Sequence, residues 1–222
     1  MLITLENVRD NLRTRDGQRV YFLGEGDSLT SSARDYLTRE RIPILPAKKA
    51  AITRYRGLDG AWYDEKPEHM TQLTGELLVP KTHPRIVLRG KLDSLEGDLL
   101  LLSLEEPGVG EPCRELLGYV RRMLKAEVLD TPLPEEKLLG LSMDELRSHS
   151  QFPQKYLGTP HFMPEPKHGL TVARLNRLRT RVRETELAAA AAFPQGREDI
   201  IRGLNRLSSA VYILMLKCVK EQ

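Results

Sequence analysis

Basic side chains are concentrated in two stretches of this 222-residue sequence that contain no acidic residue. Arginine and lysine gathered from different helices can hold one phosphate, and the planar arginine fork suits phosphate oxygens well. A solvated helix face is the alternative interpretation of either stretch taken alone. The residues are, from 81 to 91, Lys81, Arg85, Arg89 and Lys91, and from 167 to 183, Lys167, Arg174, Arg177, Arg179, Arg181 and Arg183.

Spacing singles out a polar row in the second stretch. Arg179, Arg183 and Glu186 lie at i, i+4 and i+7, on one face of a predicted helix. Apolar residues at 175, 178 and 182 form the neighbouring stripe, so the row borders a buried seam. An arginine in that position needs a carboxylate or an anion as its partner, and Asp93 is one candidate.

Asn205 lies in the middle of the last predicted helix, beside its apolar stripe. Asparagine has low helix propensity, so its amide either bonds across helices or contacts a ligand. His161 and His168 lie in a proline-rich segment, where solvated histidines are the rule, and we predict no metal site. Phe162, in the same segment, is either part of a loop core or an aromatic lid over a flat ligand. HExxH, nucleophile-elbow, Walker A and GxGxxG sequences are absent.

The composition excludes several classes of protein. A net charge of +3 argues against a long nucleic acid as partner, and 5% aromatic residues argue against a base-stacking platform. Two cysteines, Cys113 and Cys218, cannot form a disulfide scaffold, which favours a reducing compartment. No apolar run reaches the ~18 residues of a membrane span, and the N-terminal residues do not resemble a secretory signal. We therefore expect a cytoplasmic protein with no membrane partner.

The elements that must position these residues fall into two parts. Residues 1–65 predict a small α+β unit with helices at 2–13 and 28–39, a strand at 18–23 and a hairpin formed by 50–55 and 61–63. Residues 66–222 predict a helical bundle of four to five helices, so that the chain is mainly α. The expected helices are 85–104, 112–129, a short one after Ser142, 170–192 and 197–219, with a long loop at 152–169.

Three segments of the second part resemble ATP:cob(I)alamin adenosyltransferases of the ethanolamine-utilisation type. They are KPEHMTQLTGELLVPKTHPRIVLRGKLDSLEG (66–97), LRTRVRETE (178–186) and LNRLSSAVYILM (204–215). The N-terminal run LTSSARDYLTRERIPI (29–44) resembles the same type. Each motif alone is moderately specific for the family, but their order and spacing together are strong evidence for it. The resemblance covers roughly residues 66–219.

The resemblance assigns roles to individual residues. Asp93 matches an aspartate that pairs with an arginine in the family, here Arg179. Arg183 and Glu186 match ATP-binding residues, and Asn205 matches an asparagine that contacts ATP.

Other positions follow from the same resemblance. Lys81 matches a phosphate-binding lysine, and Arg85 is a further candidate for ATP. Thr71 lies in 69–75, which would have to replace the phosphate loop of the broader family. A phenylalanine of the family crowds the lower face of the corrin; His161 or Phe162 falls there, and Phe162 is favoured because it is apolar.

Two departures from the family are visible. The Asp-Glu-Leu motif of the broader family reads Asp-Ser-Leu from Asp93. Some ethanolamine-type enzymes carry a histidine and a Cys-Cys-x-x-Cys cluster before the bundle, whereas the first cysteine here is Cys113. We therefore expect that metal requirement not to carry over.

The resemblance implies transfer of the 5′-deoxyadenosyl group of ATP to cobalt(I) of the corrinoid, with release of triphosphate. It implies Mg²⁺ held through phosphates and water, a homo-oligomer (a trimer, with a dimer as the alternative), and a reductase or a bacterial microcompartment as a further partner. Three rival interpretations stand beside it: a nucleotide- or corrinoid-binding protein without catalysis, a regulatory interaction protein, and a plain helical scaffold.

Overall fold

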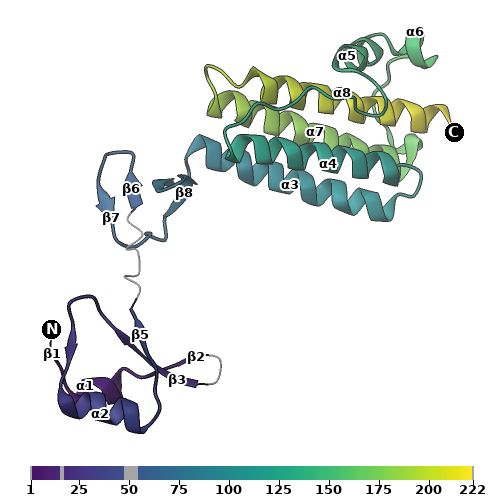
Figure 1. Cartoon of the computed structure of the whole chain (residues 1–222). Helices are drawn as coiled ribbons and strands as arrows, with labels where there is room; N and C mark the ends of the chain where they lie inside the picture. The colour runs from purple at the N-terminus through teal and green to yellow at the C-terminus, as the bar shows by residue number, and fades with distance from the viewer. Residues whose placement is uncertain (1, 16–17, 48–54, 222) are drawn as a thin grey trace. The chain divides into compact units, whose positions relative to one another are not determined.

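The computed structural model describes residues 2–15, 18–47 and 55–221. The chain divides into two compact units, residues 1–66 and 67–222, and each is described by itself (Figure 1). Residues 50–54 of the expected N-terminal hairpin lie outside the described residues.

The first unit is a small α+β structure around a core of its own. Two threonines explain where its helices begin, because the side chains of Thr4 and Thr30 accept hydrogen bonds from Asn7 and Ala33 and so cap them. The residues before each cap are extended, so the expected helices at 2–13 and 28–39 were too long at their starts. The elements are β1 (Leu2–Ile3), α1 (Leu5–Asp10), β2 (Arg13–Arg15), β3 (Gln18–Leu23), β4 (Ser28–Leu29), α2 (Ser31–Arg39), β5 (Ile44–Pro46), β6 (Tyr55–Gly57) and β7 (Trp62–Tyr63).

The strands of this unit pair in separate small groups. β1 pairs with β4 in parallel, and β3 lies between β2 (antiparallel) and β5 (parallel). Val8, Ala33 and Leu37 from the two helices are fully buried, and they pack in one cluster with residues of β1 and β3. β6 and β7 form an antiparallel hairpin.

The second unit is a helical bundle, as the sequence predicted, and it is preceded by a two-stranded hairpin that was not predicted (Figure 1). β8 and β9 are antiparallel, and α3, α4, α7 and α8 are the long helices. The elements are β8 (Met70–Thr74), β9 (Leu77–Pro80), α3 (Pro84–Glu105), α4 (Gly110–Val128), α5 (Met143–Gln151), α6 (Pro153–Leu157), a 3₁₀ turn η1 (Pro166–His168), α7 (Gly169–Ala192) and α8 (Glu198–Lys220).

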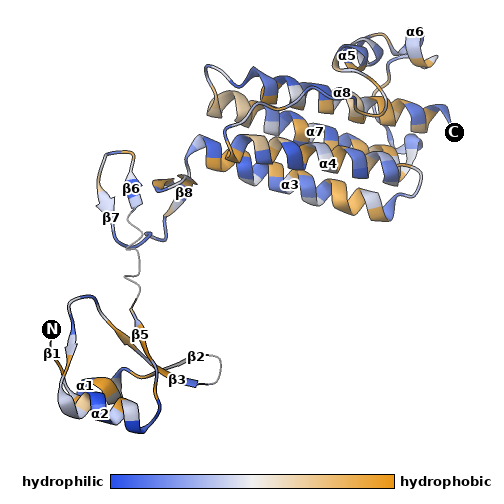
Figure 2. Ribbon diagram, in the orientation of Figure 1, coloured by the Kyte–Doolittle hydropathy of each residue, from blue (hydrophilic) through white to orange (hydrophobic). Residues whose placement is uncertain are grey.

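Capping and periodicity fix the ends and the packing of these helices. His83 accepts a hydrogen bond from the backbone N–H of Arg85, and Pro84 occupies the first turn of α3, where its missing N–H costs nothing. The buried leucines of α3 recur every three or four residues along one face. Figure 2 shows the resulting division of the long helices into hydrophobic and hydrophilic faces. α7 packs against both α3 and α8, which makes it the helix that positions most of the candidate site.

The long loop expected at 152–169 is irregular only in part, because helical turns occupy about half of it. Pro153 begins α6 and Pro166 begins the 3₁₀ turn, because proline is well suited to the first turn of a helix. Gly158 ends α6 with a φ of 71°, in the left-handed region that glycine tolerates. The continuous stretch 158–165 stays irregular, as predicted.

A buried carboxylate joins the hairpin to the bundle. Glu127, at the end of α4, is fully buried and forms ion pairs with Arg85 and Arg89 of α3. Arg89 also donates to the carbonyl of Leu73 on β8, at 3.0 Å. Two elements of the bundle and the hairpin are therefore held by one ion-paired group.

Replacing Glu127 by alanine is expected to destabilise the protein by about 3–5 kcal/mol, because two guanidinium groups would be left half-buried without their carboxylate. The measurement is the free energy of unfolding in urea. Glu136→Ala is the matched control, since its pair with Arg122 is more exposed and should cost ~1 kcal/mol or less. Equal losses for the two variants would contradict the structural role of Glu127.

Candidate functional site

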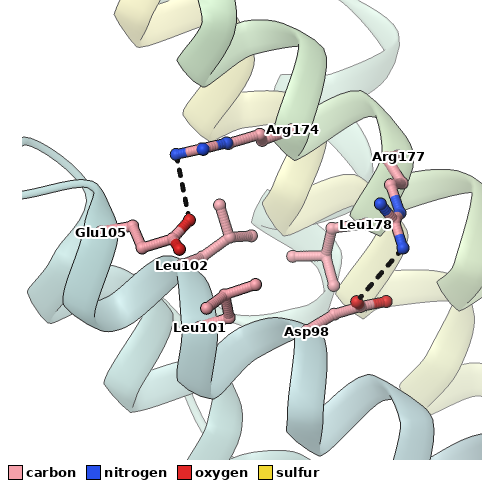
Figure 3. A pocket seen from close by; sticks show the side chains of 7 residues that line it. All are labelled: Asp98, Leu101, Leu102, Glu105, Arg174, Arg177 and Leu178. Atoms are coloured by element: carbon pink, nitrogen blue, oxygen red, sulfur yellow. Dashed lines mark ion pairs between the residues drawn. The ribbon is translucent and has the colours of Figure 1, made fainter.

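The arginines of α7 are divided between two faces of the helix. Arg174, Arg177 and Arg181 face α3, where they pair with Glu105 and with Asp98. Figure 3 shows two of these pairs, Arg174–Glu105 at 3.1 Å and Arg177–Asp98 at 4.0 Å, with leucines of both helices between them. On this face the arginines are paired with acids, which agrees with a helix face that binds no ligand.

The polar row predicted at i, i+4 and i+7 lies on the other side of α7. Arg179, Arg183 and Glu186 line an open cavity of about 440 Å³ between α7 and α8, which we name the α7–α8 cavity. Asn205 enters it from α8. The structure thus brings together four of the predicted site residues. The full lining is Arg179, Arg183, Glu186, Leu187, Ala190, Ile201, Asn205 and Ser208.

Arg179 brings a buried donor atom to this cavity that lacks a partner. Among the residues that the structure describes, its buried Nε atom has no hydrogen-bond partner. Burial lowers the pKa of Arg179, and the neighbouring Arg183 guanidinium lowers it further. Two cations side by side with an unsatisfied buried donor are stabilised by a bound anion, which suits a phosphate or carboxylate ligand.

Asn205 is bonded across helices, and its contact with a ligand stays a prediction. Its amide Nδ2 donates to Glu186 Oε1 across the helix pair at 3.0 Å, and its Oδ1 accepts from Arg206 at 2.6 Å. The amide is therefore bonded across helices, as a structural asparagine would be. It is also exposed and lines the cavity, where these bonds fix its orientation.

A second and larger cavity adjoins the first. It has a volume of about 680 Å³ and shares Arg179, Asn205 and Ser208 with the α7–α8 cavity. We name it the loop cavity because the segment 158–165 supplies His161 and Phe162 to its wall. Its other lining residues are Arg147, Ser150, Gln151, Arg206, Ser209 and Tyr212.

Phe162 is half-buried and packs against the bundle core while it lines the loop cavity. Its ring stacks on Tyr212, with centroids 6.0 Å apart, and meets the edge of His168 at 4.9 Å. The loop-core interpretation therefore agrees with the structure. A lid over a flat ligand stays a prediction for a residue that borders an open cavity.

Asp93 and Arg179 do not pair within the described chain, so a pair between them stays a prediction for two copies of the chain. Asp93 lies on the exposed side of α3, whereas Arg179 stacks over the ring of Tyr212 on α8, 5.1 Å from its centroid. Asp93 is on a solvent-exposed side of α3, whereas Arg179 is on the side of α7 that faces the cavity. The acids that α3 presents to α7 are Asp98 and Glu105 instead.

The other predicted ATP-binding residues lie outside the lining of both cavities. Thr71 is on β8 opposite Val79, and Lys81 follows β9 as an exposed side chain. The stretch 69–75 is strand and turn, not a loop at a helix start. Arg85 donates to Glu127 and lies over the Phe193 ring, which counts against the phosphate role predicted for it.

Sequence reasoning did not identify Tyr212 and Arg206 as site residues. Arg206 is almost completely buried, and burial followed by the charge of Arg147 lowers its pKa. Tyr212 is seven residues after Asn205, which is the spacing of one helix face, and that spacing was the available signal. Within residues 2–15, 18–47 and 55–221, no group of three or more histidine, cysteine or acidic side chains is placed to hold a metal ion. None of the helices described is both long and apolar enough to cross a membrane.

Comparisons with known proteins agree on one family. The model of the family "Cobalamin adenosyltransferase" matches residues 63–218. The corrinoid adenosyltransferase EutT of Salmonella typhimurium is 39% identical over 166 residues, and that of Escherichia coli K12 is 38% identical over 167 residues. These alignments cover 71% of this chain and 61% of each relative, so the chain spans less than two thirds of their length.

A solved structure has the same fold. It is a variant of the PduO-type ATP:corrinoid adenosyltransferase from Lactobacillus reuteri, complexed with cobalamin and ATP. The TM-score is 0.55 at 14% sequence identity, and the match covers 70% of this chain and 92% of that one. The helical-bundle fold predicted from the sequence is thereby confirmed.

Proposed function

Because the chain belongs to the cobalamin adenosyltransferase family, we propose that it transfers the 5′-deoxyadenosyl group of ATP to cob(I)alamin. Cobalt(I) attacks C5′ of the ribose, the cobalt–carbon bond forms, and the C5′–oxygen bond breaks with its electron pair leaving on triphosphate. The observation that carries the proposal is that Arg179, Arg183, Glu186 and Asn205 line one cavity. That cavity adjoins the one bordered by Phe162.

The residues of the α7–α8 cavity have two tasks in this reaction. The guanidinium groups of Arg179 and Arg183 stabilise the charge that develops on the leaving triphosphate. Asn205 and Glu186, already bonded to each other, orient the nucleotide so that C5′ points toward the cobalt. The reduced cobalt is itself the nucleophile, so the chain supplies position and electrostatics. Lys81 is proposed as a further phosphate ligand, with Thr71 beside it in the preceding hairpin.

The site offers Mg²⁺ one carboxylate, so most of the ligands of the ion would be water and phosphate oxygens. Glu186 is the single carboxylate among the lining residues of the α7–α8 cavity, and one of its oxygens already accepts from Asn205. A metal ion that keeps most of its water and arrives on the triphosphate needs no more than this. Bound there, Mg²⁺ would neutralise part of the phosphate charge.

The aromatic side chain of Phe162 is proposed to act on the corrinoid. Placed against the lower face of the corrin, it excludes water and the lower axial ligand, which makes cobalt(II) easier to reduce to cobalt(I). Its half-buried position, stacked on Tyr212 at the edge of the loop cavity, supports this role.

A homo-oligomer is part of the proposal, with a trimer expected and a dimer as the alternative. Asp93 is exposed on α3, and the α7–α8 cavity that Arg179 lines is open. A second copy of the chain can therefore bring the Asp93 carboxylate to Arg179. Sedimentation equilibrium of the full chain measures the assembly, and a monomer with full activity would contradict it. Ethanolamine utilisation is the proposed pathway, with association to a microcompartment as its proposed location.

The test of the activity is to mix the protein, MgATP and reduced cobalamin under anaerobic conditions. Loss of the cob(I)alamin spectrum should accompany the appearance of adenosylcobalamin and triphosphate, and neither should occur without ATP. A non-catalytic binding protein would bind both ligands without forming product. Absence of adenosylcobalamin would overturn the proposed function.

A further inference from the structure

The segment that carries Phe162 is held at its middle by a tyrosine of α8. Tyr212 is buried, with 9% of its surface exposed, and its hydroxyl lies 3.1 Å from Nδ1 of His161 and 3.4 Å from the backbone N of Phe162. The other ring nitrogen of His161, Nε2, lies 3.0 Å from the carbonyl oxygen of Gln151 at the end of α5. One imidazole therefore connects the segment to two helices.

The directions of these hydrogen bonds follow from the groups involved. A backbone carbonyl only accepts, so the Nε2 atom of His161 carries its proton and donates to Gln151. In the neutral ring Nδ1 is then an acceptor, and the hydroxyl of Tyr212 donates to it. The oxygen of Tyr212 accepts from the N–H of Phe162. The single hydroxyl is thus both a donor and an acceptor to the segment.

Ring contacts add to this arrangement. Phe162 stacks on Tyr212 with an interplanar angle of 16°, and it makes an edge contact with His168 at 4.9 Å. His168 is buried and accepts a hydrogen bond from the backbone N–H of Glu165 at 2.9 Å, which fixes the end of the segment. Phe162 is therefore held by its backbone, by its ring and by the residues on both sides of it.

The same tyrosine ring lies under Arg179, whose guanidinium carbon is 5.1 Å from the ring centroid. Arg179 lines both cavities, so Tyr212 lies where the nucleotide side and the Phe162 side of the site meet. Because Tyr212 contacts both side chains, it can fix the position of Phe162 relative to Arg179.

We infer that Tyr212 and His161 are positioning residues, which hold Phe162 in place beside Arg179 before any substrate binds. The inference rests on the proposed function, since it gives Phe162 its task. Preorganisation of this kind lowers the cost of ordering the segment when the corrinoid arrives. Tyr212 and His161 would touch neither cobalt nor the adenosyl group.

The test compares Tyr212→Phe with the wild-type protein in four measurements. Hydrogen–deuterium exchange of residues 158–165 should become faster in the variant. The rate of adenosylcobalamin formation from cob(II)alamin with a reductant should fall about five- to tenfold, the size expected for loss of one or two neutral hydrogen bonds. Transfer starting from cob(I)alamin should stay within about twofold. The electron paramagnetic resonance spectrum of bound cob(II)alamin with MgATP should show a smaller fraction without the lower ligand.

Control variants separate positioning from general destabilisation. Tyr156→Phe removes a hydroxyl from an aromatic ring that stacks on His149, outside this network, and should change none of the measurements. His161→Leu should reproduce the Tyr212→Phe effect, and the double variant should be no worse than the more affected single one, as for residues that act as a unit.

Two outcomes would overturn the inference. Unchanged exchange in Tyr212→Phe would show that the hydroxyl does not hold the segment, and equal losses from cob(II)alamin and cob(I)alamin would show that it does not act through Phe162. Failure of the proposed function is distinguishable, because the wild-type protein would then make no adenosylcobalamin while the exchange measurement still decides whether Tyr212 holds the segment.

Discussion

Replacing Arg183 by alanine is expected to lower the rate of adenosyl transfer about 10²–10³-fold, the cost of losing one preorganised charge at a developing anion. Arg183 lines the α7–α8 cavity beside Arg179, so its removal leaves the triphosphate with one cation fewer. The side chain is exposed, and the fold should therefore be unaffected. The measurement is the initial rate from cob(I)alamin, together with the thermal unfolding midpoint.

Arg177→Ala is the matched control for this prediction. It removes an arginine from the same helix, but one that faces Asp98 of α3 at 4.0 Å instead of the cavity. Its activity should stay within about twofold of the wild-type value, since an exposed pair contributes about 1 kcal/mol or less to stability. An Arg183→Ala variant that retained full activity, or an equal loss in both variants, would refute the assigned role.

Phe162→Ala is expected to slow adenosylcobalamin formation from cob(II)alamin more than formation from cob(I)alamin. The loss of rate from cob(II)alamin should be larger by a factor of about ten or more. Alanine leaves space under the corrin for water or the lower ligand, and both stabilise cobalt(II) against reduction. Cobalt(I) binds no lower ligand, so direct transfer does not need the aromatic ring. The two rates are measured in parallel, at saturating ATP.

Phe152→Ala is the control for this second prediction, because Phe152 is an exposed phenylalanine at the end of α5 and is not among the lining residues of either cavity. It should leave both rates unchanged. Equal losses from cob(II)alamin and cob(I)alamin in Phe162→Ala would argue against a lid under the corrin and in favour of a general packing role.

Much of the bundle could be predicted from residue spacing, for physical reasons that hold in this chain. The recurrence of leucine along α3 and the proline at its first turn define a helix with one buried face, and both are local features. The polar row of Arg179, Arg183 and Glu186 was likewise a local prediction, because helix periodicity alone places three such residues on one side.

Partners that are distant in the sequence could not be predicted in the same way. Nothing local to α3 shows that Arg85 lies against Glu127, 42 residues later, so its charge was assigned to a phosphate. The sequence also could not show that Asp93 and Arg179 do not meet within one chain, since which faces of α3 and α7 meet depends on how the helices are rotated in the bundle. The prolines of 152–169 indicated a loop, but two of them begin helical turns.

The division of α7 into two arginine faces has a consequence for how the sequence can vary during evolution. On the α3 side, Arg177 and Arg181 need only a positive charge near Asp98, and lysine supplies one. On the α8 side, Arg179 and Arg183 need the planar fork and its fixed donors, which lysine lacks. Arginine-to-lysine exchanges along this helix can be selected as a library for growth that depends on adenosylcobalamin. The selection should retain lysine in place of Arg177 and Arg181, which lie one helix turn apart. It should reject lysine in place of Arg179 and Arg183.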